Sequence, residues 1–208
     1  MQRRVRGHGL MRGLAAGLLG VALLSSALAL GWPRPPAEGS AAVTFARDMS
    51  AHHVQAVDMS VTLFKRAADP AVKLLAQDVI LTQQAQIGQM QGWLMAWGRP
   101  LAGRDAPMAG MERASMGLAS PAEERELQHL PVSTAETRYL VLLRRHHQGG
   151  VAMAKSALRT VQRPEVQAFA KRMVAAQTSE IKAIDALLAR RMAGGQPAQP
   201  EMDGMAHE

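Results

Sequence analysis

The spacing of apolar and polar residues predicts four long helices. In the first, seven residues recur three or four positions apart and share about a 100° arc of the helix: Phe45, Met49, His53, Ala56, Ser60, Leu63 and Ala67. The charged Arg47, Asp58 and Lys65 lie on the opposite side. His52 and Met59 are predicted at the edge of this arc. One face of the helix is therefore expected to pack in a core.

Helix-stopping and helix-starting residues separate the stretches of the first half. The first helix is expected over residues 43–67. Asp69 can cap the next helix, and Pro70 suits its first position because proline has no N–H to leave unpaired there. This second helix is predicted to run to about Trp97, just before Gly98.

The second half contains the same kinds of signal. Residues 120–123 (Ser-Pro-Ala-Glu) predict the start of a short helix, which a proline ends. Ser133 and Glu136 are predicted to form a capping box for the third long helix, which ends near Gln162. The fourth helix is expected over residues 164–192.

The two halves are copies of one unit. Residues 45–94 match residues 139–188 without a gap, at the 94-position offset that separates His52 from His146. The matched pairs include Phe45 and Tyr139, Met59 and Met153, Val57 and Val151, Pro70 and Pro164, Val72 and Val166, Ala76 and Ala170, Gln83 and Gln177, Ile87 and Ile181, and Leu94 and Leu188. A duplicated helical hairpin buries its apolar face against its copy. The sequence thus predicts an all-α four-helix bundle over residues 43–192, with a linker at 98–132.

Composition narrows the chemistry. The chain has no cysteine, so disulfides and thiolate metal sites are excluded, whereas its 14 methionines offer another soft ligand. Four arginines, Arg3, Arg4, Arg6 and Arg12, belong to the predicted leader, which has no acidic residue. Without them, 20 basic residues face 17 acidic ones, and no basic patch carries stacking aromatics. A nucleic-acid-binding protein is therefore not expected.

The two ends do not resemble globular sequence. Residues 1–30 combine early arginines, an apolar stretch and an Ala-Leu-Ala cleavage pattern at 27–29, which predicts a signal peptide. The apolar stretch is also nearly long enough for an uncleaved anchor, the one membrane attachment expected. Both interpretations place the remainder in the periplasm or outside the cell. Residues 31–42 are expected to form a flexible tether, and residues 193–208 a disordered tail.

The histidine pairs are candidate metal ligands: His52, His53, His146 and His147. Met49 lies one helical turn before the first pair, and Met59 and Met153 follow the two pairs at equal spacing. Imidazole and thioether together favour copper, because thioether sulfur suits Cu(I). Leu143 replaces the second-copy equivalent of Met49, so one better and one poorer site are expected. The alternatives are hydrogen-bonded structural histidines and methionines that only fill the core.

A second group of ligands is predicted outside the long helices. In the linker these are Met108, Met111 and Met116; in the tail they are Met202, Met205 and His207. A methionine in a polar, disordered segment has no packing role, so these residues are candidates for capturing a metal and passing it to the bundle.

Enzyme signatures are sparse. A di-iron bundle needs repeated Glu-x-x-His motifs, and the only one here runs from Glu126 to His129. No zinc-protease motif, nucleophile elbow or phosphate loop occurs. Four polar residues of the second and fourth helices are expected either to contact the imidazoles or to form a solvated face: Gln83, Gln86, Gln177 and Glu180.

These motifs resemble an exported bacterial family, domain of unknown function 305. The resemblance lies in the doubled Met-x-x-His-His pattern, in the downstream Gln83, Gln86, Ile87, Met90 and Trp93, and in residues 108–111 (Met-Ala-Gly-Met). It implies a ferritin-like four-helix bundle, copper binding in some members, and a periplasmic or extracellular location. Leu143 and Gln86 depart from the family pattern.

The leading hypothesis is a non-enzymatic copper-binding protein outside the cytoplasm, which sequesters copper or passes it to a copper-handling partner protein. The alternative is a helical interaction module whose paired histidines are structural or pH-responsive. A metal-dependent oxidase is the third and most distant hypothesis.

Overall fold

The structure is a computed structural model that describes residues 34–194, and this part of the chain is all-α. Its helices are α2 (Ala41–Arg66), α3 (Pro70–Ala96), α4 (Pro121–His129), α5 (Val132–Thr160) and α6 (Pro164–Met192). The predicted fold class and the four long helices are confirmed. None of the described helices is long and apolar enough to cross a membrane. The predicted signal segment, and the tail from residue 195, lie outside the described residues.

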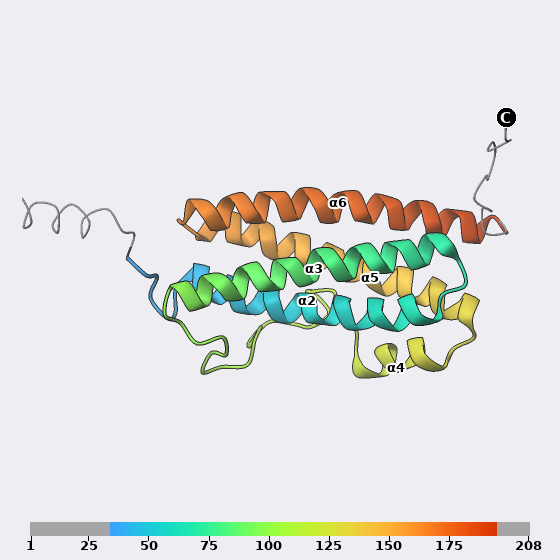
Figure 1. The fold of residues 1–208 in the computed structure, drawn as a ribbon, viewed down its shortest axis with the longest axis horizontal. Helices are drawn as coiled ribbons and strands as arrows, with labels where there is room; N and C mark the ends of the chain where they lie inside the picture. Colours follow the sequence, from blue (N-terminus) through green and yellow to red (C-terminus); the bar gives the residue numbers. More distant parts are fainter. Residues whose placement is uncertain (1–33, 195–208) are drawn as a thin grey trace, which may run out of the picture. The chain divides into compact units, whose positions relative to one another are not determined.

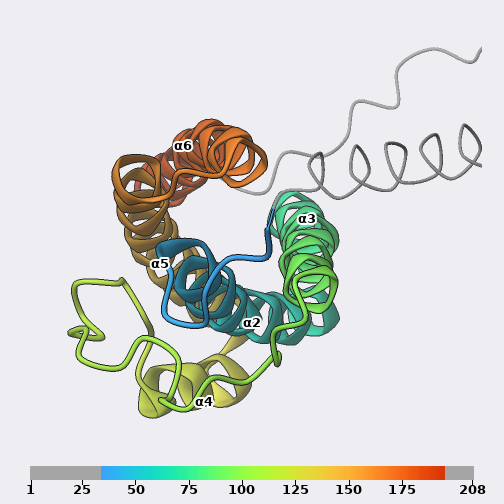
Figure 2. The same cartoon turned by 90° about the vertical axis from the view of Figure 1, so that its left-hand side faces the viewer.

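The long helices form two hairpins that meet through one helix of each. α2 pairs with α3, α5 pairs with α6, and α2 packs against α5. Figure 2 shows α6, α5, α2 and α3 following one another in an arc, with α4 outside α2 and α5. In Figure 1 the four long helices run lengthwise beside each other. The α2 and α5 helices, which carry the histidine pairs, are therefore the inner helices of the bundle.

The predicted helix starts at α3 and α4 are confirmed. The Asp69 carboxylate accepts a hydrogen bond from the Ala71 N–H at 2.9 Å, and Pro70 occupies the first turn. At α4, Ser120 and Glu123 form both bonds of a capping box. These ends were predictable because their hydrogen bonds join residues adjacent in sequence.

The predicted capping box at α5 is wrong. The α5 helix starts at Val132, and no side chain caps it. Instead, Glu136 reaches the turn between α2 and α3, where its carboxylate accepts from the Ala68 and Asp69 N–H groups at 2.7 and 2.8 Å. It also pairs with Arg191 of α6 at 2.7 Å. Glu136 thus joins the two hairpins at one end of the bundle.

We expect Glu136→Gln to lower the free energy of unfolding by about 1–2 kcal/mol, because Gln keeps one acceptor oxygen but loses the charge that faces Arg191. Urea unfolding measures this change. Glu126→Gln is the control, since the Glu126 side chain is 45% exposed in its pair with Arg138. Equal losses in the two variants would contradict the assigned role of Glu136.

Two apolar clusters fill the bundle. Cluster 1 joins the start of α2 and the end of α3 to the end of α5 and the start of α6, and includes Met49, Met90 and Met173. Cluster 2 joins the opposite ends of the same helices and includes Met59 and Leu143. Along α2 and α5 the histidine pairs lie between the residues of these clusters. The bundle therefore has a polar layer between two apolar halves.

Candidate functional site

The polar layer contains four imidazoles shielded from solvent. His52, His53, His146 and His147 each have 0% exposure. The rings of His52 and His146 face each other across α2 and α5, with centroids 3.8 Å apart. His52 and Met59, predicted at the edge of the apolar arc of α2, are both buried. The linker and α4 cover a side of α2 that the apolar pattern of this helix alone did not predict to be buried.

Each of these histidines uses Nε2 in a hydrogen bond. His52 Nε2 donates to the Met116 carbonyl, and His146 Nε2 donates to the His52 carbonyl, both at 2.9 Å. His53 and His147 form 2.6 Å bonds with Gln86 Oε1 and Glu180 Oε2. Carbonyl oxygens only accept, so Nε2 carries the proton and Nδ1 keeps its lone pair. All four Nδ1 atoms are buried and lack a protein partner.

The partners of His53 and His147 occupy equivalent positions of the repeat. Gln86 and Glu180 are 94 positions apart, as are the two histidines that they contact. Gln83 and Gln177 are also matched; they are buried, and their amide atoms have no protein partner. These four residues face the bundle interior, so the alternative of a solvated face is wrong.

Burial keeps His52, His53 and His146 neutral near pH 7. Desolvation is the main cause that lowers the pKa of His52 to about 4 and of His53 to about 3. The pKa of His146 is also lowered, first by burial and then by the neighbouring histidines. A neutral imidazole is the form that binds a metal, so these side chains need not lose a proton to become ligands.

The predicted methionines divide between the two clusters. Met49 is fully buried in cluster 1 with Met90 and Met173, and the partly buried Met153 packs against this cluster. Met59 lies in cluster 2, so it does not join Met49 and Met153. Met90 and Met173 are not among the metal ligands predicted from the sequence. The structure brings them to Met49 because the end of α3 and the start of α6 meet there.

The repeat exposes a difference between the clusters. In the other copy of the repeat, Leu143 takes the position of Met49, Ile184 that of Met90 and Val79 that of Met173. All three lie in cluster 2. Met153 is matched by Met59. The same four structural positions are thus all methionine at cluster 1 and mainly aliphatic at cluster 2.

The linker methionines occupy three different environments. Met116 is buried, and its carbonyl contacts His52. Met108 has a left-handed backbone, with φ of 60°, and its N–H donates to the Asp48 carboxylate at 2.8 Å. Met111 is 46% exposed. The tail candidates Met202, Met205 and His207 lie outside the described residues.

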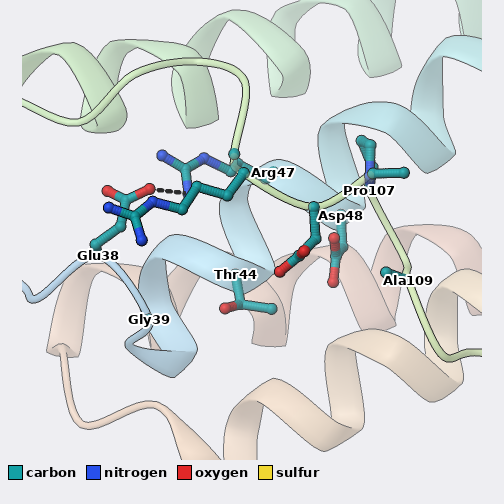
Figure 3. A pocket seen from close by; sticks show the side chains of 11 residues that line it. Glu38, Gly39, Thr44, Arg47, Asp48, Pro107 and Ala109 are labelled. Carbon is teal, nitrogen blue, oxygen red and sulfur yellow. Dashed lines mark ion pairs between the residues drawn. The ribbon is translucent and has the colours of Figure 1, made fainter.

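No three His, Asp or Glu side chains between residues 34 and 194 form a ready-made metal-binding group. A hollow of about 510 Å³ lies between the start of α2 and the linker. Figure 3 shows Thr44, Arg47 and Asp48 of α2 there, beside Pro107 and Ala109. Arg47 pairs with Glu38 at 2.6 Å, so opposite charges already meet in this hollow. The four unpaired imidazole Nδ1 atoms lie instead in the histidine layer.

Comparison with known proteins agrees with the fold. The family model described as Domain of unknown function (DUF305) matches residues 42–188. No curated protein matches the chain.

Solved structures give the same architecture. A DUF305 protein from Streptomyces coelicolor, described as secreted, is 41% identical; the match has a TM-score of 0.70 and covers 78% of this chain and 99% of that one. A DUF305 fragment from Deinococcus radiodurans is 37% identical, with a TM-score of 0.67 and coverage of 74% and 99%. CopM in its Cu(I)-bound form is 24% identical, with a TM-score of 0.57 and coverage of 71% and 94%. At that identity the likeness to CopM shows the fold alone.

Proposed function

The chain belongs to the DUF305 family, and on that premise we propose that it binds copper at the junction of the histidine layer and cluster 1. The protein holds the metal or passes it to a copper-handling partner, and carries out no chemical conversion. The observation that carries this proposal is the set of four buried imidazole Nδ1 atoms without a protein partner. A buried polar atom left unpaired is costly unless a ligand uses it.

The chemistry of the neighbouring side chains supports copper over harder metals. Neutral imidazole accepts several transition metals, but thioether sulfur selects Cu(I). Met49, Met90 and Met173 are buried on one side of the layer, with Met153 beside them. No three His, Asp or Glu side chains meet in the described part of the chain, and sulfur is the additional ligand that we propose.

The ligand set that we propose therefore differs between the side of the histidine layer that faces cluster 1 and the side that faces cluster 2. The side facing cluster 1 combines imidazole with four methionines, whereas cluster 2 offers Met59 beside aliphatic side chains. The better site is assigned to the first side, with Ag(I) as a mimic of Cu(I). Among proteins of the same fold, CopM has been solved in Cu(I)-bound, Cu(II)-bound and Ag-bound forms.

We place this function in the periplasm or outside the cell. The support is the signal-like composition of residues 1–30 and the similar Streptomyces coelicolor protein described as secreted. Cysteine is absent from the whole sequence, so the proposed copper ligands do not include a thiol.

One observation favours the helical interaction module as a second candidate. Every Nε2 of the histidine layer already has a hydrogen-bond partner, and the His52 and His146 rings lie against each other with centroids 3.8 Å apart. A layer of this kind can fix the register of two hairpins without a metal. The two candidates differ in one measurable property, which is affinity for Cu(I).

We expect the double variant Met49→Leu, Met90→Leu to bind Cu(I) at least about tenfold more weakly than the chain with the tail substitutions alone, a loss of about 1.4 kcal/mol. Leucine conserves volume, so the fold is retained. The measurement is competition with the Cu(I) chelator bicinchoninate, with the full chain in anaerobic buffer. All samples carry Met202→Leu, Met205→Leu and His207→Ala, so that the tail does not contribute.

Met59→Leu is the matched control, because Met59 is equally buried but lies in cluster 2. It is expected to leave the affinity unchanged. Equal loss in Met59→Leu and in the double variant would reject the unequal ligand set. If the chain with the substituted tail binds no Cu(I), the interaction module replaces the copper proposal.

A further inference from the structure

A groove of about 560 Å³ lies between the first turns of α2 and the second half of α5. Thr44, Phe45 and Asp48 line it from α2, and residues 149–160 line it from α5. Gly39 and Ala41, around the start of α2, and Met111 and Ser115 of the linker complete the lining. The groove shares Thr44 and Asp48 with the neighbouring hollow of Figure 3.

Two methionines line this groove at different depths. Met111 is 46% exposed, so its sulfur is available to an ion in solvent. Met153 is partly buried, and it also packs against cluster 1, where Met49 and Met90 lie. Thioethers therefore follow one another from the protein surface to the buried methionines.

The linker is held on both sides of Met111. Before it, the Met108 N–H donates to the Asp48 carboxylate. After it, the Met116 carbonyl accepts from His52 and lies so close to α5 that a Cβ at Gly149 would be 1.8 Å from it. These contacts fix the place of Met111 on the groove.

The charge of the groove suits a cation. Of the described residues that line it, Asp48 alone is charged, and it is acidic. Arg47, the neighbouring cation, is not part of the lining, and its guanidinium instead contacts Glu38 and the Pro100 carbonyl. A monovalent cation entering the groove therefore meets one carboxylate and two thioethers.

We propose that this groove is the entry site for a soft monovalent metal ion, which binds Met111 and then Met153 before reaching cluster 1. The inference rests on the proposed function, since it concerns the route to that site. Each step is a ligand exchange: a thioether bonds to Cu(I) as the previous ligand leaves, and the metal keeps its oxidation state. Short steps between similar ligands avoid releasing a bare ion into an apolar core.

The test is the rate at which the full chain takes Cu(I) from its bicinchoninate complex, followed by absorbance after rapid mixing. All samples carry the tail substitutions given above. We expect Met111→Leu and Ala152→Trp each to slow uptake about tenfold, because one removes the outer thioether and the other fills the groove. The final amount of bound copper should equal that of the unmodified chain.

Two substitutions elsewhere are matched controls. Met95→Leu removes a methionine that is 66% exposed on α3, and Ala183→Trp adds the same indole to an exposed position of α6. Both are expected to leave the rate unchanged.

Three results would overturn the entry site, and they are distinct. Full uptake at an unchanged rate in Met111→Leu and Ala152→Trp would leave copper binding intact but place the route elsewhere. A weaker equilibrium affinity in Met111→Leu, without a slower rate, would make Met111 a permanent ligand. No uptake by the chain that carries only the tail substitutions would reject the proposed function together with the groove.

Discussion

Gly149→Ala is expected to lower the free energy of unfolding by about 3 kcal/mol or more. A Cβ at this position would lie 1.8 Å from the Met116 carbonyl oxygen and 2.2 Å from its carbon. Both are backbone atoms, so a side-chain rotation cannot relieve the overlap, and the linker must leave α5. That movement also breaks the bond from His52 to the same carbonyl, leaving a buried N–H unpaired. Urea unfolding followed by circular dichroism measures the loss.

Gly88→Ala is the control and should change stability in the opposite direction. A Cβ at Gly88 meets nothing within 4 Å, and the residue lies inside α3. Alanine is preferred to glycine inside a helix by about 0.5–1 kcal/mol. A Gly149→Ala protein as stable as the Gly88→Ala protein would disprove the close contact between the linker and α5.

Acidification is expected to destabilise the protein well above the pH at which its carboxylates titrate. The pKa values of His52 and His53 are about 4 and about 3 in the folded protein, against 6.5 for an ordinary histidine. Between these values the unfolded chain binds more protons than the folded one, so stability rises with pH in this interval. The stabilisation is complete above about pH 6.5 and is lost as the pH falls toward 4.

The expected loss between about pH 7 and pH 4.5 is about 3–5 kcal/mol, since each unit of lowered pKa corresponds to about 1.4 kcal/mol. Urea unfolding at these two pH values measures it. In this pH interval the stability contribution of the histidines is lost, but that of carboxylates such as Glu123 is kept. Arg145 lowers the pKa of Glu123 to about 2, so its contribution is lost only below about pH 4.5. His53→Gln should make the dependence shallower. Constant stability across the interval would contradict neutral buried histidines.

Local signals explain which parts of the fold the sequence predicted. Asp69, Pro70 and the Ser120 box mark helix starts because their hydrogen bonds lie within a few residues. Glu136 matches the same local pattern at α5, but a more demanding tertiary contact uses its carboxylate. A capping motif therefore shows which hydrogen bond a side chain can form at its own helix. A tertiary contact can use the same side chain instead.

The candidate site was predicted only in part, for a related reason. The histidine pairs are recognisable because the repeat preserves them. Met90 and Met173 occupy different positions of the repeat unit, so comparing the two copies does not group them. They meet because the end of α3 faces the start of α6, which is a property of how two hairpins pack. The place of Met111 likewise depends on the linker's path across Gly149.

The path of the linker has a consequence for the ancestry of the bundle. His146 bonds to the His52 carbonyl, but His52 bonds to the linker's Met116 carbonyl and not to that of His146. In a homodimer of one hairpin, every substitution would appear on both sides of the two-fold axis. Joining the copies in one chain, with a connection that covers one side only, removes that constraint. The two apolar clusters can then differ within a single protein, with methionine at four positions of cluster 1 and mainly aliphatic residues at the same positions of cluster 2.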